Sequence, residues 1–387
     1  MGGMQSDCTG NGGPTMTRPI RWGVIGLGIG YQHALAIMKS ENAQLVAVCD
    51  RQSEQREKWL MEFPSVLAFP DEGDLFEEVE LDALVVASYD PEHGPTIERA
   101  LNQGINVFAE KPLATTLDQY IATANALERN PRVRLTTNTL LRRSPRFLAL
   151  KQMIAAGELG SIFHLEGDYL YGRLEKLSAG WRGKDPTYSV TLGGAVHVVD
   201  LLTWLTGERP HRVYALGSGK GLRDSTYSAD SSFNGDDFRI ALLEFPSGMT
   251  AKISANYACV LPPFHRLDVF GSLGTYINVP VSSVMANNEP VEGEWSSAYV
   301  FHSRETTSPP VTINLPYPAT PKATLIANFN EVLSGTAKLE ISEQDAMDVL
   351  AVCLAIDASA KNAGPMDIEY CQIPQRVGQP IHARGLE

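Results

Sequence analysis

The chain has 387 residues, of which 43% are hydrophobic, and a formal net charge of −13 at pH 7. Because this length exceeds that of an ordinary single domain, we expect two domains with substantial cores. The negative charge argues against binding to nucleic acid or to a membrane surface, both of which need basic patches. No stretch of about 20 uninterrupted apolar residues predicts a membrane span.

The five cysteines are scattered along the chain and contain no C-x-x-C pair. This usage is typical of a reducing compartment, so we expect a cytoplasmic protein with no disulfide framework and no zinc site. The eight histidines also lack metal-ligand spacing, and no metal centre is predicted. Residues 1–18 are polar and rich in glycine, without the basic and apolar regions of a secretory signal, which predicts a disordered leader.

An apolar run at 20–25 opens into a G-L-G-I-G turn, and a helical pattern follows it. A strand, a glycine turn and a helix start form a dinucleotide-binding signature, because the glycines permit a tight turn and close approach of the pyrophosphate to the helix N-terminus. The expected cofactor contacts in this turn are Gly26, Gly28, Ile29 and Gly30.

A second apolar strand at 44–49 ends at Asp50, twenty residues beyond Gly30. A carboxylate at this place accepts hydrogen bonds from ribose hydroxyls and repels a 2′-phosphate, which favours NAD over NADP. Arg51 argues in the opposite direction, because a guanidinium can bind a phosphate. We expect both residues to lie at the adenosine end of the cofactor, and the sequence leaves NADP open.

Helices and strands then alternate as far as residue 136. Helices are expected at 53–61, 71–79, 92–102 and 116–128, and strands at 66–69, 83–87, around Val107 and at 133–136. This alternation indicates crossover connections and a parallel sheet covered on both faces. Residues 19–140 are therefore predicted to form a doubly wound Rossmann domain of the α/β class.

Polar residues follow two of these strands at their carboxyl ends, where ligands bind in open α/β sheets. Ser88, Asp90 and His93 follow the strand at 83–87 and are candidate cofactor contacts. Glu110 and Lys111 end the Val107 strand, and two adjacent charges there are costly unless solvent or a ligand meets them. The alternative to ligand contact is that these residues form a surface salt bridge at the strand end.

The residue after Lys111 is Pro112, which fixes the backbone. A cis bond before Pro112 would aim the Lys111 ammonium group rigidly towards the crevice. Lys111 is therefore a candidate to contact a ligand in this crevice.

After about residue 144 the pattern changes to longer alternating runs with β-branched and aromatic residues. A helix is expected at 145–156, and strands at 161–171, 211–217, 237–245, 249–257, 266–270 and 275–279. Their consecutive order predicts a mostly antiparallel sheet, so residues 141–365 should form an α+β domain.

Polar segments at 223–234 and over much of 281–310 are expected to be loops. Late helices at 324–333 and 342–360 are expected to pack back on the first domain, the second with a capping start at Ser342. Residues 366–387 are expected to form a C-terminal tail.

One stretch of the second domain carries chemistry. Two glycines at 193 and 194 open a helix that Gly207 closes, and His197 lies in its first turn with Asp200 three residues later. Because a helix N-terminus disfavours imidazolium, we expect a neutral His197 that accepts a proton from a substrate hydroxyl. The alternative is a histidine that satisfies neighbouring backbone groups; Lys111 across the cleft favours the base.

Three aromatic residues and one arginine are candidates for the substrate pocket. Trp181 and Tyr169 or Tyr171 offer faces that stack on a sugar ring, and Arg182 offers donors for hydroxyls or a carboxylate. The alternative is that Trp181 belongs to the core and that Arg182 forms an ion pair between domains.

These motifs resemble the glucose–fructose oxidoreductase/inositol dehydrogenase (Gfo/Idh/MocA) family from about Arg21 to Gly364. The supporting segments are the glycine turn, A-E-K-P-L-A at 109–114, K-Q-M-I-A-A-G-E-L-G at 151–160, G-W-R at 180–182, the 197–207 helix and F-G-S-L-G-T at 270–275. The resemblance implies NAD(P)-dependent oxidation of a sugar, polyol or related hydroxy or keto compound. It also implies that the C-terminal sheet forms a homodimer or homotetramer, that Lys111 binds nicotinamide and substrate, and that His197 is the acid/base.

Three positions depart from the family pattern. Gly193 stands where the family places an Asp or Asn, Ser88-Tyr89 replaces Thr-Pro, and Gly30 falls one position early. Asp200 is the nearby candidate to replace the missing carboxylate. Two alternatives to a dehydrogenase therefore stay open: a glycoside hydrolase that uses NAD transiently, and a non-catalytic protein that senses nicotinamide or a sugar.

Overall fold

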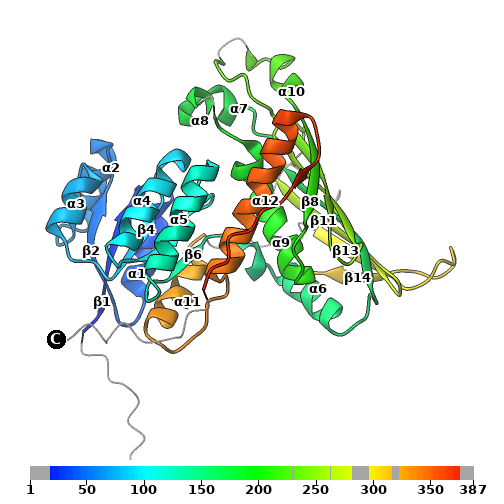
Figure 1. The fold of residues 1–387 in the computed structure, drawn as a ribbon, viewed down its shortest axis with the longest axis horizontal. Helices are drawn as coiled ribbons and strands as arrows, with labels where there is room; N and C mark the ends of the chain where they lie inside the picture. Colours follow the sequence, from blue (N-terminus) through cyan, green and yellow to red (C-terminus); the bar gives the residue numbers. More distant parts are fainter. Residues whose placement is uncertain are drawn as a thin grey trace, which may run out of the picture.

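The computed structural model describes residues 18–185, 187–228, 231–261, 263–280, 296–315 and 322–374. Most of the expected leader (1–17) and the last part of the expected tail (375–387) lie outside them. Figure 1 shows an N-terminal lobe of helices around a small sheet and a C-terminal lobe whose large sheet is seen nearly edge-on. Helix α12 (Glu343–Asn362) runs obliquely between the two lobes.

The N-terminal lobe contains a six-stranded parallel sheet in the order β3-β2-β1-β4-β5-β6. Its strands are β1 (Ile20–Ile25), β2 (Ala43–Cys49), β3 (Leu67–Phe69), β4 (Ala83–Val86), β5 (Asn106–Ala109) and β6 (Leu135–Thr137). Its helices are α1 (Gly30–Lys39), α2 (Ser53–Glu62), α3 (Glu72–Glu78), α4 (Asp90–Asn102) and α5 (Leu117–Arg129). The predicted Rossmann fold is confirmed. The strand order reverses between β1 and β4, and a ligand crevice forms at the carboxyl ends of strands at such a reversal.

The C-terminal lobe is built on a nine-stranded sheet in the order β14-β13-β12-β11-β7-β10-β9-β8-β15. Its strands are β7 (Ile162–Leu170), β8 (Arg212–Ser218), β9 (Phe238–Glu244), β10 (Thr250–Asn256), β11 (Phe264–Gly271), β12 (Thr275–Pro280), β13 (Ser296–Phe301), β14 (Val311–Asn314) and β15 (Met366–Asp367). Within this sheet β7 and β10 pair in parallel, whereas the other recorded pairs are antiparallel. The predicted α+β class with a mostly antiparallel sheet is confirmed.

Helices cover one face of this sheet. The helical segments after β6 are η1 (Leu140–Arg143), α6 (Pro145–Ala155), α7 (Glu175–Ser178), α8 (Gly180–Lys184), the π-helical turn η2 (Thr191–Ala195), α9 (Val196–Thr206), α10 (Lys220–Arg223) and α11 (Thr324–Leu333). Helix α9 packs on β7 and α12 packs on β8. Short helices α7 and α8 lie above the space between the lobes (Figure 1). None of the helices in the described ranges is long and apolar enough to span a membrane.

Two predicted irregular segments contain strands. The expected loop at 281–310 includes β13, which pairs with β12, while residues 281–295 lie outside the described ranges. The expected tail begins with β15, which pairs with the edge strand β8. The position of both strands depends on backbone hydrogen bonds to a neighbouring strand. A local side-chain pattern does not predict such pairing.

The late helices join the lobes. Helix α11 packs against α1, and the indole nitrogen of Trp22 in β1 donates to Oδ1 of Asn330 in α11 at 3.2 Å. At the start of α12, Ser342 and Asp345 form the predicted capping box. The late helices α11 and α12 therefore pack against the first domain, although they are distant from it in sequence, and connect it to the second domain.

Candidate active site

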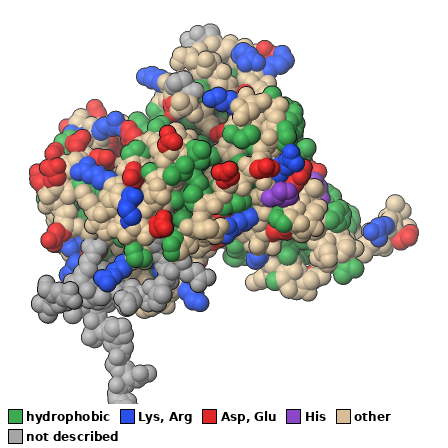
Figure 2. Space-filling view, viewed as in Figure 1, with side chains coloured by type: hydrophobic (Ala, Val, Ile, Leu, Met, Phe, Trp, Pro, Cys, Tyr) green, Lys and Arg blue, Asp and Glu red, His purple; other side chains and the backbone are tan. Residues whose placement is uncertain are grey.

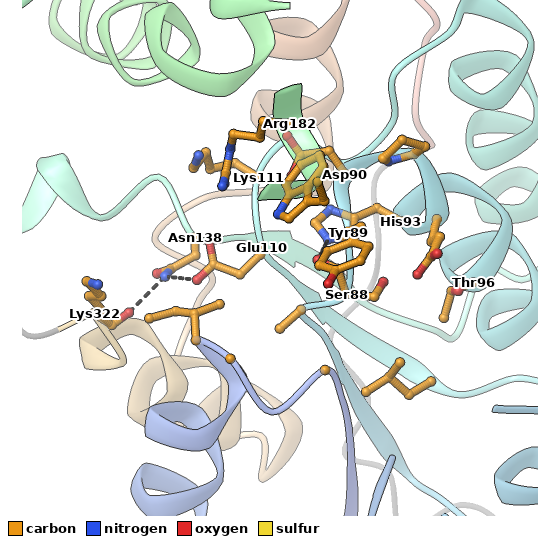
Figure 3. Close-up of a pocket in the computed structure, with 18 of the residues that line it drawn as sticks. Ser88, Tyr89, Asp90, His93, Thr96, Glu110, Lys111, Asn138, Arg182 and Lys322 are labelled. Carbon is orange, nitrogen blue, oxygen red and sulfur yellow. Dashed lines mark hydrogen bonds between the residues drawn. The ribbon is translucent and has the colours of Figure 1, made fainter. Parts of the chain in front are cut away.

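A cavity of about 1040 Å³ lies between the two domains. The carboxyl ends of β1, β2, β4 and β5 line one side, and segments that follow β7 and begin α9 line the other. Figure 3 shows Lys111 and Arg182 next to one another in this view, with Ser88, Tyr89, Asp90 and His93 grouped beside them. A cleft of this size between domains is a usual place for a cofactor and a small substrate.

A different physical reason explains why glycine occupies each of three positions in the first turn. Gly26 has φ +90°, and a Cβ there would lie 2.3 Å from the carbonyl oxygen of Ala87, so only glycine fits the turn. A Cβ at Gly28 would meet nothing within 4 Å, which leaves open space for a ligand. A Cβ at Gly30 would lie 3.0 Å from Cγ1 of Val24, because α1 packs closely on β1 here.

Helix α1 begins directly after this turn and has no side-chain cap at its N-terminus. Uncapped backbone N–H groups and the positive end of the helix dipole favour a phosphate. The open space at Gly28 lies in the same cavity wall. These residues therefore fit the pyrophosphate of a dinucleotide.

Asp50 and Arg51 lie at the end of β2 and line the cavity. The Asp50 carboxylate accepts hydrogen bonds from the backbone N–H groups of Leu27 (2.7 Å) and Gln52 (2.8 Å), which fixes its orientation beside the glycine turn. Arg51 is exposed and forms an ion pair with Glu92. The carboxylate is therefore fixed, whereas the guanidinium is already engaged by an acid.

Ser88, Asp90 and His93 also line the cavity. The Ser88 hydroxyl is buried and has no hydrogen-bond partner among the described residues, so it is available to a ligand. The His93 ring is 1% exposed, with Nδ1 2.7 Å from the Pro112 carbonyl oxygen and Nε2 3.1 Å from that of Ser88. His93 thus connects the two loops, while Asp90 begins α4.

Glu110 belongs to a buried hydrogen-bonded group. Its Oε1 atom lies 2.9 Å from Nε2 of His33 and accepts a hydrogen bond from Nδ2 of Asn138 at 2.7 Å (Figure 3). Burial raises the pKa of Glu110, but His33, the charge of Lys111 and Asn138 outweigh burial and hold that pKa below its usual value. Glu110 is therefore a carboxylate held in place by hydrogen bonds, directly before Lys111 in the chain.

Lys111 crosses from the first domain to the second. The Lys111–Pro112 bond is cis, the geometry that the sequence allowed. The Lys111 ammonium donates a hydrogen bond to the carbonyl oxygen of Gly193 at 3.0 Å. Two of its three N–H donors remain for other partners, such as a substrate hydroxyl.

His197 lines the cavity opposite Lys111. Burial, together with the positive charge of Lys111 and the His265 ring, holds its pKa well below 6.5, so the imidazole is neutral as predicted. The cause differs from the predicted one. The helical run begins with η2 at Thr191–Ala195, so His197 lies beyond the first turn and burial is the main reason.

Nδ1 of His197 is buried without a hydrogen-bond partner in the part of the chain that the structure describes. Since His197 lines the cavity, Nε2 is the candidate ring nitrogen for a ligand. Tyr169 lies nearly parallel to the imidazole, with ring centroids 6.3 Å apart.

Asp200 does not replace the carboxylate that is missing at Gly193. It is 0% exposed, and both carboxylate oxygens accept hydrogen bonds from Arg142, the shortest at 2.7 Å. Arg142 also contacts Asp345 at 3.2 Å, on the side of α9 that faces η1 and α12. His197 and Asp200, three residues apart, share one side of the helix, but the Asp200 carboxylate is fully engaged by the buried Arg142 guanidinium.

The substrate candidates line the same cavity and contact one another or the first domain through their rings. Trp181 stacks on Tyr89 across the domain boundary, with ring centroids 5.0 Å apart. The Arg182 guanidinium carbon lies 4.3 Å from the centroid of the Trp181 ring. Tyr169 is largely buried and stacks on Tyr171 at 4.5 Å. All five residues line the cavity.

The sequence did not identify three further lining residues: Arg173, Lys176 and His265. His265 lies opposite Tyr169 in the β7–β11 register, and a sequence pattern does not reveal register between distant strands. Arg173 and Lys176 follow β7 in an irregular segment and α7. A basic pair directly after a strand was the available signal, but many exposed loops have the same composition.

Comparisons with known proteins agree with this architecture. Residues 20–138 match the model of the oxidoreductase family with an NAD-binding Rossmann fold, and residues 147–277 match the GFO/IDH/MocA C-terminal domain. Inositol 2-dehydrogenase from Rubrobacter xylanophilus is 28% identical over 94% of this chain and 97% of its own length. Inositol 2-dehydrogenase from Burkholderia multivorans is 30% identical over 65% of this chain and 72% of its own length.

A solved structure shares the fold over nearly the whole chain. Scyllo-inositol dehydrogenase from Lactobacillus casei, with bound NAD(H) and scyllo-inositol, has a TM-score of 0.71 and is 18% identical, covering 90% of this chain and 99% of that chain. With the glycine turn, the fixed Asp50 carboxylate and the open space at Gly28, the site fits NAD. The chain belongs to the Gfo/Idh/MocA family of NAD-binding oxidoreductases.

Proposed function

We propose that the protein is an NAD-dependent dehydrogenase that acts on the CH–OH group of a sugar, a polyol or a related hydroxy or keto compound. One observation carries this proposal: the Lys111 ammonium and a neutral His197 line the same cavity as the dinucleotide turn. The relatives that are named inositol 2-dehydrogenases support a polyol or sugar as the substrate class.

NAD held by the glycine turn and Asp50 would supply the hydride acceptor for the substrate carbon. Nε2 of His197 accepts the hydroxyl proton, because the neutral ring has a free lone pair there. Lys111 donates to the same hydroxyl oxygen and stabilises the negative charge that develops on it. The hydrogen bond to Gly193 holds the ammonium at the boundary between the domains while this happens.

For the cofactor we propose contacts from Gly26, Gly28, Ile29 and Gly30 to the pyrophosphate and from Asp50 to the ribose. Ser88, Asp90, Glu110 and Lys111 would surround the nicotinamide half, and His93 would position its loops. Asp50 favours NAD because its carboxylate repels a 2′-phosphate. NADP stays the alternative, with Arg51 as the residue that would serve it.

The first test is nicotinamide reduction by the purified protein over a panel of sugars, polyols and sugar acids, with NAD and NADP in parallel. We expect turnover with NAD. His197→Asn should lower kcat by about 10²- to 10⁴-fold, and Lys111→Met should abolish turnover, while NAD binding measured by calorimetry persists in His197→Asn. Full activity in either variant would refute the assigned roles.

The two alternatives give different outcomes in the same assay. A glycoside hydrolase that uses NAD transiently would release sugar from a glycoside without a net change in nicotinamide absorbance. A sensor would bind NAD and a sugar but turn over neither. The carboxylate missing at Gly193 is the observation that keeps the sensor in view.

We also propose that the protein forms a homodimer or homotetramer through the open face of the nine-stranded sheet. Tyr214 lies opposite Leu242 in the register of β8 and β9, and both side chains are exposed, as is Leu216 two positions along. Apolar side chains gathered on an open sheet face favour an interface. Light scattering tests this, because Leu242→Glu should shift the protein towards monomer.

We propose a cytoplasmic location because the cysteines of the described residues are free thiols. Cys49 and Cys353 are buried as free thiols, and Cys259 and Cys371 are also unpaired with one another in the described residues. Free cysteines are typical of a reducing compartment. Fractionation of the native host would test this location.

A further inference from the structure

Four basic side chains gather at the substrate end of the cavity: Lys111, Arg173, Lys176 and Arg182. None of them forms an ion pair within 4.0 Å with a carboxylate in the described ranges, although other partly buried cations of this chain do. Arg142 contacts Asp200 at 2.7 Å, for example. Arg173 and Lys176 therefore bring positive charge to the cavity without an ion-paired acid, whereas Lys111 lies beside the Glu110 carboxylate and Arg182 interacts with Asp90.

Aromatic rings hold two of these cations in place. The Arg173 guanidinium carbon lies 4.4 Å from the centroid of Tyr171, and that of Arg182 lies 4.3 Å from the centroid of Trp181. Stacking of this kind fixes the plane of a guanidinium. Arg182 also donates to the hydroxyl of Tyr188, so part of its N–H edge is engaged. The cations are therefore pre-organised for a ligand and are not loose surface side chains.

The charges lie close enough to oppose one another. Burial, together with the positive charges of Arg173, Arg182 and Lys111, lowers the pKa of Lys176 to about 8, and Glu175 opposes them. Clustered cations destabilise one another unless an anion joins them. Since the whole chain has a net charge of −13, a generally basic composition does not explain the cluster. Figure 2 shows carboxylates scattered over the surface of the first domain.

The cofactor does not account for Arg173 and Lys176. The pyrophosphate has its own site at the glycine turn and the N-terminus of α1, and the adenosine ribose has Asp50. Arg173 and Lys176 instead follow β7 and line the cavity together with Tyr171 and His265. They belong to the part of the cavity where the proposed substrate would lie.

We propose that the substrate of this enzyme is anionic, and that Arg173 and Lys176 bind a carboxylate or phosphate group on it while Lys111 and His197 act on its hydroxyl. This inference rests on the proposed dehydrogenase function and narrows its substrate class to sugar acids or sugar phosphates. A neutral polyol would leave the cluster uncompensated. A guanidinium fork and an ammonium are the donors that proteins use for both groups.

The test measures ligand binding to the full-length protein saturated with NADH, by calorimetry. The probes are D-glucuronate, D-glucose 6-phosphate and neutral D-glucose. We expect one of the two anions to bind at least tenfold more tightly than glucose, with an affinity that falls as salt rises. Preference for glucuronate assigns the cluster to a carboxylate, and preference for the phosphate assigns it to a phosphoryl group.

Two uncharged variants, Arg173→Met and Lys176→Met, should each weaken binding of the preferred anion by about tenfold or more. Their affinities for glucose and NADH should not change. Lys184→Met is the matched control, because Lys184 is an exposed cation of α8 outside the cavity lining. It should bind the anion like the wild type.

The remaining outcomes separate the two proposals. Equal affinity for all three probes, unchanged anion binding in both Met variants, or loss of NADH affinity in those variants would each overturn the anionic subsite. Turnover of neutral sugars alone would overturn it too, and would leave the dehydrogenase proposal standing. Anion-specific binding without hydride transfer from any sugar acid or sugar phosphate would support the subsite and overturn the dehydrogenase function.

Discussion

A Cβ atom at Gly193 would lie 2.0 Å from the hydroxyl oxygen of Tyr188. Tyr188 is buried, and its hydroxyl lies 3.1 Å from that of Tyr257, which fixes its position. A phenol pair therefore fills the space beside the helix where related chains place a carboxylate. The carbonyl oxygen of the same glycine accepts the Lys111 hydrogen bond, so Gly193 contributes backbone to the site in place of a side chain.

Restoring the carboxylate with Gly193→Asp should therefore harm the protein. The new side chain overlaps a buried ring that is hydrogen-bonded, and overpacking of this kind costs about 1–3 kcal/mol of unfolding free energy. We expect a lower midpoint in urea unfolding and reduced turnover. An increase in turnover without loss of stability would contradict this expectation.

A double-mutant cycle identifies the obstacle. Tyr188→Ala removes the phenol that occupies the space, so Gly193→Asp should cost less in that background than in the wild type. Contacting residues show such non-additivity, whereas independent sites add. Additive costs would mean that Tyr188 does not determine the effect.

Asp200→Asn should act on stability and not on the proton transfer at His197. The variant leaves the Arg142 guanidinium buried without its main counter-charge, and breaking a buried pair costs about 3–5 kcal/mol. We expect a large fall in the unfolding free energy, measured by urea titration. The pH profile of kcat/KM for the folded fraction should match that of the wild type, and a displaced profile would instead tie Asp200 to the base.

The glycine turn and Asp50 could be predicted because each depends on local geometry. A turn with φ +90° at Gly26 and an acid at the end of the next strand follow from spacing alone. The same holds for the alternation that gives the parallel sheet. Lys111 was chosen for a related reason, since a charge at the end of a buried apolar strand is costly unless solvent or a ligand meets it.

The second half of the site could not be predicted in this way. His265 reaches Tyr169 only through the pairing of β7 with β11, and Tyr257 meets Tyr188 across 69 residues of sequence. Asp200 was placed beside His197 from helical spacing, but Arg142 from a distant segment determines where its carboxylate lies. These contacts depend on strand register and domain packing, which short-range patterns do not contain.

The low pKa of His197 predicts the acid side of the pH profile. Burial, with the charge of Lys111 and the His265 ring, holds that pKa well below 6.5, and a histidine is a base only above its pKa. The kcat/KM for substrate oxidation should therefore stay constant between pH 8 and pH 6. With a histidine of ordinary pKa as the base, it would fall over this range. A tenfold fall per pH unit beginning near 6.5 would show that His197 is accessible to solvent in the complex.

Lys176 predicts the alkaline side of substrate binding. Burial is the main reason that its pKa is about 8, and Arg173, Arg182 and Lys111 add to the effect against Glu175. A lysine is charged below its pKa, so the ammonium that would hold an anionic substrate is lost as pH rises through about 8. The Kd of the preferred anion should then increase by up to about tenfold per pH unit between pH 8 and pH 9.5.

Calorimetry across this range tests the assignment with two controls. The Kd of D-glucose should stay constant because a neutral ligand does not need the ammonium. In Lys176→Met the Kd of the anion should be higher at pH 7 and then show no inflection near 8, since the titrating group is gone. An inflection that persists in the variant would assign the titration to another group, and a Kd that stays flat in the wild type would remove Lys176 from the anion site.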